Sequence, residues 1–499
     1  VWLRLTDQRF SQAEPAPMLR EMSSLPAIET ARVKLISRAY GRPSIASLVP
    51  VACPAALLAV VLAGIGRNIL VPDTWVGLVS GREIAHHGLP TVEHLTVLGQ
   101  GNQWVDQQWL AQLGLYAAER AGGVGLMVAI CLIAVVVAFG LAARAAQQRG
   151  ASPLAILAFF VAAFVAAPWG VQARTQALAL PLFSLILWLL LRDRDARGTS
   201  TIWALPILCL WANVHGSVVL GAALVSAYGI QALVRTGWHW RAAALVALAP
   251  AAVFASPFVL RLPAYYRLML FDPPYGHEIV EWQRTTPSGL TAPFFTLVAV
   301  TCVLVVLRRR RVTALDCLLL AITLAAALSA VRLIPWFALT MLAVMPALVS
   351  RASGAPSFRG PAATVLAALG TTAILAAAGL AASRSYEVSS EARGLAVVRE
   401  QMRGGLVFAD LDLADRLLWK IPTLRGRIAY DGRPELLSRR QFDGVIRFAR
   451  QEPGWQEFLR GYSLVVTNAA IARSMSETGH WRRVYADQTF VVVRRAGSG

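Results

Sequence analysis

Acidic residues and a histidine are concentrated in one polar loop near the start of the chain, at about 67–121. Asp73 follows the first long apolar stretch, and Glu93, His94 and Asp106 lie further along the same loop. A carboxylate can deprotonate a hydroxyl group or bind a metal ion, and an imidazole can carry a proton. An Asp at the start of a helix can equally be an N-cap, and solvated loops commonly contain such residues. We take these four as candidate catalytic residues, with a structural role as the alternative for each.

Residues that could bind a substrate occur in the same loop and in later polar gaps. Guanidinium groups match the oxygens of a phosphate, although an arginine at a membrane surface can also simply reach toward water. Polar side chains at the end of an apolar stretch are costly in hydrocarbon unless they face a cavity. The candidate substrate-binding residues are Trp75, Trp104, Arg174, Asn213, His215 and Arg332.

The elements that must position these residues are membrane helices. The chain has 499 residues, of which 56% are hydrophobic, and a mean hydropathy of +0.55. A helix needs about 20 mostly apolar residues to cross the hydrocarbon core. We predict about eleven transmembrane helices, near 45–66, 122–143, 152–168, 176–191, 200–213, 216–234, 241–259, 290–307, 312–331, 333–350 and 361–383.

The positive charge of the chain predicts its orientation. The net charge is +19, but it is spread over many short loops and forms no continuous basic face, which argues against a nucleic-acid partner. Arginine clusters occupy every second gap between the predicted spans, as the positive-inside rule requires of cytoplasmic loops. We therefore expect a cytoplasmic N-terminus and an extracytoplasmic C-terminus. The acidic loop would lie outside, where cytoplasmic nucleotides are not available.

The same pattern divides the chain into three parts. Residues 1–44 are expected to be a cytoplasmic segment and residues 45–383 a transmembrane domain, whose long outer loop 67–121 contains two interfacial amphipathic helices. Residues 384–499 turn polar and show strand and helix signals, which predicts an extracytoplasmic α/β domain. The expected elements of that domain are strands at 406–409, 427–430 and 462–467, a helix at 412–419 and a hairpin at 484–493.

Seven short motifs occur in a fixed order over about 400 residues: Asp73-Thr74-Trp75 with Gly81-Arg82, Pro90 to His94, Trp104 to Leu110, Arg174-Thr175-Gln176, Trp211 to Gly216, Tyr430 to Arg433, and Trp481 to Asp487. This ordered set resembles bacterial multi-spanning membrane proteins of the C-type glycosyltransferase (GT-C) fold, a largely uncharacterised group. The resemblance implies an α-helical polytopic protein of the plasma (inner) membrane with a C-terminal extracytoplasmic α/β domain.

The resemblance also implies an activity. Members of this fold class move a sugar from a polyprenyl-phosphate carrier to a glycan, lipid or protein acceptor at the outer face of the membrane. Asp73 would be the base, the reaction would invert the anomeric centre, and Arg174 or Arg332 would stabilise the departing phosphate. The motifs indicate no cofactor with certainty, and a divalent metal ion, Mg²⁺ or Mn²⁺, is left open.

Two alternatives belong to other function classes. One is a non-catalytic envelope or assembly protein that keeps the GT-C fold and uses its outer domain for binding. The other is a transporter or flippase of lipid-linked glycans, although transporters usually carry ionisable residues in the middle of their spans and show paired repeats. All three hypotheses have membrane lipids as partners.

Overall fold

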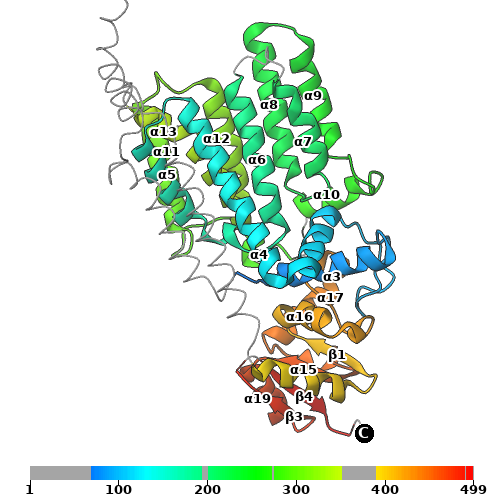
Figure 1. Cartoon of the computed structure of the whole chain (residues 1–499). Coiled ribbons are helices and arrows are strands. Elements are labelled where there is room, and N and C mark those ends of the chain that lie inside the picture. Colours follow the sequence, from blue (N-terminus) through cyan, green and yellow to red (C-terminus); the bar gives the residue numbers. More distant parts are fainter. Residues whose placement is uncertain are drawn as a thin grey trace, which may run out of the picture. The chain divides into compact units, whose positions relative to one another are not determined.

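Apolar helices packed side by side make up most of the chain between residues 109 and 349 in the computed structural model (Figure 1). The structure describes residues 69–193, 200–271, 273, 275–350, 389–488 and 490–497. The predicted spans at 45–66 and 361–383 lie outside these residues, as does the predicted segment 1–44. The helices of this part are α4 (Trp109–Gln148), α5 (Pro153–Ala166), α6 (Thr175–Arg192), α7 (Ala204–Trp211), α8 (Val218–Thr236), α9 (Trp240–Ala252), α10 (Leu262–Phe271), α11 (Ala292–Leu307), α12 (Ala314–Ser329) and α13 (Ile334–Val349).

Most predicted spans coincide with these helices within a few residues. Four helical stretches of the described chain are long and apolar enough to cross a membrane, and shorter apolar helices lie among them. The chain is therefore a multi-pass membrane protein, and the total of eleven spans stays a prediction. The predicted span 241–259 is too long, because α9 ends at Ala252.

One predicted interfacial helix and one predicted span are parts of the same helix. Helix α4 is 40 residues long and departs from helical geometry only at Gly122 and Gly123. Gly123 has a φ of +70°, which glycine adopts without the steric cost that a side chain would bring. The two glycines therefore separate an N-terminal part, predicted at about 107–120, from the apolar part predicted at 122–143.

Local sequence signals explain where several helices begin. The Ser152 side chain accepts a hydrogen bond from Ala155 N at the start of α5, and Pro153 occupies the first helical position, where no amide hydrogen is needed. Helix α12 begins with a capping box in which Thr313 and Asp316 satisfy each other's backbone amides.

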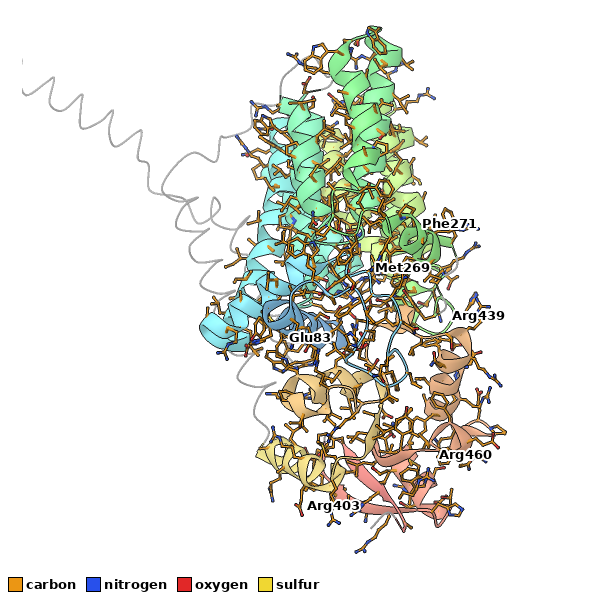
Figure 2. All side chains as sticks on the ribbon, turned by 90° about the vertical axis from the view of Figure 1, so that its right-hand side faces the viewer. Glu83, Met269, Phe271, Arg403, Arg439 and Arg460 are labelled. Carbon is orange, nitrogen blue, oxygen red and sulfur yellow. The ribbon has the colours of Figure 1, made fainter. Side chains whose placement is uncertain are left out.

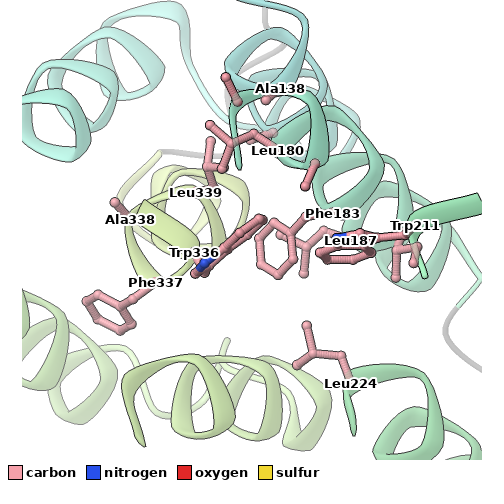
Figure 3. Close-up of a cluster of buried hydrophobic side chains, with 14 of the residues drawn as sticks. Ala138, Leu180, Phe183, Leu187, Trp211, Leu224, Trp336, Phe337, Ala338 and Leu339 are labelled. Carbon is pink, nitrogen blue, oxygen red and sulfur yellow. The ribbon is translucent and has the colours of Figure 1, made fainter. Parts of the chain in front are cut away.

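Aromatic side chains from α6, α7 and α13 form the centre of the membrane part (Figure 3). The ring centroids of Phe183 and Trp336 are 5.0 Å apart, and those of Trp211 and Trp336 are 5.6 Å apart. All three side chains are fully buried. Interlocked rings of this size hold the three helices in one register, which fixes where their ends lie.

Residues 389–497 form a four-stranded sheet with flanking helices. The elements are α15 (Ser389–Met402), β1 (Leu406–Ala409), α16 (Leu411–Lys420), α17 (Arg439–Ala449), α18 (Trp455–Phe458), β2 (Tyr462–Thr467), α19 (Ala469–Glu477), β3 (Trp481–Ala486) and β4 (Val491–Arg495). The strand order is β1-β2-β4-β3, with β1 and β2 parallel and the other pairs antiparallel. The expected helix at 412–419 and the expected terminal hairpin are present as α16 and β3–β4.

The predicted strand at 427–430 is wrong. Only Ile428 pairs there, in isolated bridges to Val407 of β1 and to Thr96 of the loop before α4. The Leu98 amide also donates to the Ala429 carbonyl at 2.9 Å. One bridge on each side is too little for a strand, but these contacts tie the loop at 96–98 to the C-terminal segment.

The loop between α3 (Pro72–His87) and α4 shares a hydrophobic core with the C-terminal segment. Leu95 and Trp104 of the loop and Val79 of α3 are buried in the same cluster as residues of β1, α16 and β4. In Figure 2, Glu83 lies where α3 meets the C-terminal segment, and its carboxylate is 2.9 Å from the guanidinium of Arg425. The predicted domain boundary at 383/384 falls outside the described residues and stays a prediction.

Candidate functional site

A buried arginine at the start of α6 joins two carboxylates from distant parts of the chain, Asp73 in the first turn of α3 and Glu281. Nη1 of Arg174 lies 3.3 Å from Asp73 Oδ2 and 2.7 Å from Glu281 Oε2. The Arg174 side chain is 3% exposed, whereas that of Asp73 is 48% exposed. Burial lowers the pKa of Arg174, but Glu281 and Asp73 outweigh this effect and raise it. Asp73 is thus an accessible carboxylate facing a fixed positive charge.

Hydrogen bonds between the start of α3 and the segment before α6 hold Asp73 and Arg174 in place. The Ala173 amide donates to the Ile69 carbonyl at 2.9 Å, and the Thr74 hydroxyl donates to the Ala173 carbonyl at 2.6 Å. Val71, and not Asp73, is the residue that precedes α3. The Asp73 side chain therefore does not cap α3, and it contacts the guanidinium of Arg174 instead.

Arg332 lies beside this group on the short 3₁₀ helix that precedes α13. Its guanidinium stacks on the Trp282 ring, 4.2 Å from the ring centroid, and Trp282 directly follows Glu281. The Arg332 carbonyl accepts a hydrogen bond from Gln176 Nε2 at 3.1 Å, which ties it to α6. Within the described ranges no carboxylate lies within ion-pair distance of Arg332. The site therefore contains one neutralised arginine and one available arginine.

His215 and Asn213 lie in the turn between α7 and α8. Burial, followed by the charges of Arg332 and Arg174, holds the pKa of His215 well below its usual value, so its ring is neutral. The Asn213 amide accepts from Trp109 Nε1 at 2.8 Å and donates to the carbonyls of Cys209 and Ala255. Asn213 thus links the start of α4 to the C-terminal ends of α7 and α9. A contact between Asn213 and substrate stays a prediction.

A second buried charge cluster joins the loop before α4 to the C-terminal segment. The Arg433 guanidinium donates to both carboxylate oxygens of Asp431 and stacks 4.1 Å above the centre of the Trp104 ring. Its Nη1 is 2.8 Å from Glu93 Oε2, at an angle that makes an ion pair but not a hydrogen bond. The other Glu93 oxygen accepts the Leu95 and Thr96 amides. Glu93, which is fully buried, is an anchor of the loop in this arrangement.

Two carboxyls between these clusters have strongly perturbed pKa values. Burial and, to a smaller extent, the charge of Glu435 raise the pKa of Asp106 to about 7 against the opposing effect of Arg433. Burial likewise raises the pKa of Glu435 to about 7, and the charges of Asp431 and Asp73 add to the rise. Carboxyls that titrate near neutral pH are typical of sites where protons move.

The structure places most of the predicted residues in two groups, one around Arg174 and one around Arg433. Asp73, Arg174, Arg332 and His215 surround the start of α6, and Asp106 lies electrostatically coupled to the Arg433 cluster. Trp75 and Trp104 are buried, under the guanidiniums of Arg416 and Arg433 respectively. His94 is exposed, and in the described part of the chain its side chain makes no contact with these groups.

Glu281, Glu435 and Arg433 were not among the predicted site residues. Glu281 is 107 residues from Arg174, and no local pattern distinguishes it from the other acidic residues of its loop. Arg433 did belong to one of the seven motifs, Tyr430 to Arg433, and that was the signal that could have placed it here.

Several buried polar atoms around α6 have no hydrogen-bond partner among the described residues. They are Arg174 Nη2, Gln172 Oε1, Gln176 Oε1, Asp106 Oδ2 and Tyr266 Oη. Buried polar groups are nearly always paired with protein, water or a ligand. Their concentration here indicates a place where a polar ligand or ordered water completes the structure.

The fit of a divalent metal ion can be tested on the same residues. The described ranges contain no group of three or more His, Cys, Asp or Glu side chains placed to hold a metal. Asp73 and Glu281 are both directed at Arg174. The described residues therefore offer no metal site here, and the question of metal dependence stays open.

Comparisons with known proteins place this arrangement in a fold. No protein-family model matches the chain, and no curated protein matches it by sequence. A crystal structure of ArnT from Cupriavidus metallidurans bound to undecaprenyl phosphate covers 90% of this chain and 99% of its own, with a TM-score of 0.51 and 15% identity. More distant are ArnT from the same organism in the apo state, with a TM-score of 0.49, and the apo oligosaccharyltransferase of Archaeoglobus fulgidus, with a TM-score of 0.47 and 70% of that chain covered. The chain therefore has the GT-C fold that its ordered motifs resemble.

Proposed function

We propose that this protein is a membrane glycosyltransferase that moves a sugar from a polyprenyl-phosphate donor to an acceptor hydroxyl at the outer face of the plasma membrane. The observation that carries the proposal is the group at the start of α6. An accessible carboxylate, Asp73, is held by a buried guanidinium, and a second guanidinium, Arg332, is available beside it. This is a base next to a phosphate-binding cation, at the end of a helix apolar enough to span the membrane.

The two arginines have different roles in this proposal. Arg174 is already neutralised by Asp73 and Glu281, so its main effect is to orient the Asp73 carboxylate. Arg332 has no such partner among the described residues, and stacking on Trp282 fixes its plane. A guanidinium held in this way can bind two oxygens of a phosphate at once. Arg332 is therefore the proposed phosphate ligand and Arg174 the positioning residue.

The proposed reaction is a single displacement. Asp73 takes the proton of the acceptor hydroxyl as its oxygen attacks the anomeric carbon. The bond from that carbon to the carrier's phosphate oxygen breaks, and the phosphate leaves with the electron pair. The positive charge of Arg332 compensates the negative charge that develops on the leaving oxygen. Because attack and departure are in line, the anomeric configuration inverts.

The fold comparison supports the donor class. The ArnT crystal structure holds undecaprenyl phosphate, which is a polyprenyl phosphate. A donor carried by a lipid also suits an extracytoplasmic site, where no nucleotide sugar is available. The sugar, the acceptor and any requirement for Mg²⁺ or Mn²⁺ are questions for the assay.

The decisive experiment separates donor binding from transfer. The full chain in nanodiscs is supplied with a panel of radiolabelled polyprenyl-phosphate sugars and membrane acceptors, with and without Mg²⁺ or Mn²⁺. We expect Asp73→Asn to abolish transfer and to leave the affinity for undecaprenyl phosphate within about twofold. We expect Arg332→Gln to weaken that affinity by about tenfold or more, the effect of losing a charge-assisted contact. Asp443→Asn, at an exposed Asp on α17, is the matched control.

Each outcome decides between the hypotheses. Transfer at the wild-type rate by Asp73→Asn would exclude Asp73 as the base. Binding of the carrier without transfer by any donor would favour the non-catalytic alternative. Movement of a lipid-linked glycan between leaflets of a proteoliposome, with no new glycosidic bond, would favour the flippase.

The proposed orientation has its own test. In a chain without other cysteines, His94→Cys and Arg309→Cys place a thiol at exposed positions in two different loops. A membrane-impermeant maleimide added to intact cells should label position 94 and spare position 309. Labelling of 309 but not 94 would invert the topology and end the proposal of an extracytoplasmic site.

A further inference from the structure

A cavity of about 560 Å³ lies between the C-terminal ends of α4 and α6, away from the candidate site. This volume is within the range of roughly 300–1,000 Å³ that small-molecule sites occupy. The lining residues are Arg144, Ala145, Gln148, Arg149, Trp188, Leu191 and Arg192. Three of these seven residues are arginines and none is acidic.

One of the arginines, Arg149, places a buried positive charge in the cavity wall. Arg149 is 8% exposed, and its Nη2 donates to Asp316 Oδ2 at 2.7 Å. Its Nη1 is also buried and has no hydrogen-bond partner among the described residues. A buried, charged N–H without a partner is costly, because the group has lost its water and gained nothing in return. An anion in the cavity would satisfy it.

The other side chains complete an anion-binding surface with an apolar wall. The Arg192 guanidinium lies 5.2 Å from the centre of the Trp188 ring, and Trp188 Nε1 donates to Gln148 Oε1 at 2.9 Å. Arg144 is held by Gln147 at 2.7 Å. The C-terminal ends of two helices carry partial negative charge, which opposes an anion, but each such end amounts to only about half a charge. Three guanidiniums outweigh it.

The position of the cavity identifies the kind of anion. Helix α6 begins next to Arg174 at the candidate site and ends at Arg192 at the cavity. Its 18 residues span about 27 Å at 1.5 Å per residue, close to the roughly 30 Å of a bilayer's hydrocarbon core. The cavity therefore lies at the membrane surface opposite the candidate site, at the depth of lipid headgroups. Trp188 is an amphipathic ring of the kind found at that depth.

We propose that this cavity binds the phosphate of an anionic membrane phospholipid, with Arg149 Nη1, Arg144 and Arg192 as its donors. The lipid is a structural ligand that holds the ends of α4, α6 and α12 together, because Arg149 also binds Asp316 of α12. This site is independent of the proposed sugar transfer and does not require it.

The test measures lipid binding and leaves activity aside. Native mass spectrometry of the delipidated full chain gives the affinity for phosphatidylglycerol, with phosphatidylcholine as the neutral lipid. We expect Arg144→Gln/Arg192→Gln to weaken phosphatidylglycerol binding by about tenfold or more. Arg309→Gln/Arg310→Gln, at two exposed arginines of another loop, should leave it unchanged.

A variant that is expected to bind the lipid more tightly shows that weaker binding by the arginine variants is not simply a result of misfolding. Asp316→Asn removes the charge that competes for Arg149 but keeps an oxygen for the Thr313 amide, which now donates to Asp316 at 3.0 Å. It should bind phosphatidylglycerol more tightly than the wild type. Equal binding by the Arg144/Arg192 and Arg309/Arg310 variants would overturn the proposal. Displacement of the lipid by millimolar inorganic phosphate would also overturn it, because the ligand would then be the free anion.

Discussion

The buried arginine that joins the loop before α4 to the C-terminal segment offers a sharp test of the structure. Replacing Arg433 with Met keeps much of its volume and its contact with Trp104 but removes the charge. Glu93, which is 0% exposed, and Asp431, which is 4% exposed, then lose the guanidinium that both face in the structure. Breaking a buried ion pair by removing one partner typically costs about 3–5 kcal/mol, because the other partner remains buried and uncompensated.

Two hydrogen bonds to Glu93 reduce the expected loss of folding free energy. Glu93 keeps its hydrogen bonds from the Leu95 and Thr96 amides, at 2.6 and 2.9 Å, so it is partly stabilised even without Arg433. We therefore expect a loss near the lower end, about 3 kcal/mol. Adding Glu93→Gln and Asp431→Asn removes the stranded charges and should recover more than half of the loss.

The assay is the free energy of unfolding in mixed micelles, measured at two pH values. Without Arg433 the freed carboxyls should have pKa values raised by burial, so the defect of Arg433→Met should be smaller at pH 5 than at pH 8. Arg460→Met, at an exposed arginine of the same segment, should change the free energy by less than about 0.5 kcal/mol. An Arg433→Met chain as stable as Arg460→Met, or one not rescued by the neutral partners, would refute the buried cluster.

Three further predictions concern a carboxyl, an ion pair and a helix contact. Asp106 has a pKa of about 7 in the folded protein, above its unfolded value, so its contribution to the free energy of unfolding falls as pH rises between about 4 and 7. In the same assay Asp106→Asn should be as stable as the wild type near pH 4. Above pH 8 its free energy of unfolding should exceed that of the wild type by up to about 4 kcal/mol. Glu281→Gln removes one of the two charges that neutralise Arg174, but because Arg332 is the proposed phosphate ligand, the affinity for undecaprenyl phosphate should change by no more than about twofold; a tenfold tightening would make Arg174 the phosphate ligand instead. Gly81→Ala would place a Cβ 2.3 Å from a backbone oxygen of α4 and should cost about 1–3 kcal/mol, whereas Gly114→Ala, which meets no atom within 4 Å, should cost nothing; equal effects would show that α3 and α4 are not in close contact.

Much of the membrane part follows from local sequence. The apolar stretch 176–191 predicts α6 almost to the residue, because a run of apolar residues of that length can be stable only as a helix in lipid. The capping signals at Ser152 and Thr313 are equally local. The strand expected at 427–430 is absent because a strand also needs continuous pairing with partners elsewhere in the chain. Its apolar pattern was right, but its partners on both sides offer only isolated bridges.

The order of polar motifs also indicated the fold class, and the likeness to ArnT agrees with it. Residue types and positions marked Asp73, Arg174 and Arg332 as candidates, since a carboxylate can act as a base and a guanidinium matches the oxygens of a phosphate. What each of them does, and whether Asp73 is the base, stays a prediction until the transfer assay is done.

The sequence by itself determined which segments form apolar helices and which polar residues lie at their ends, because hydrophobicity and helix capping act over a few residues. Only the tertiary structure decided which charges meet. Glu281 reaches Arg174 across 107 residues and Arg433 reaches Glu93, while one N–H of Arg149 has no partner among the described residues and lies beside a cavity. These pairings depend on how the helices and loops pack, and a guanidinium gives no sign in sequence of which distant carboxylate it will neutralise.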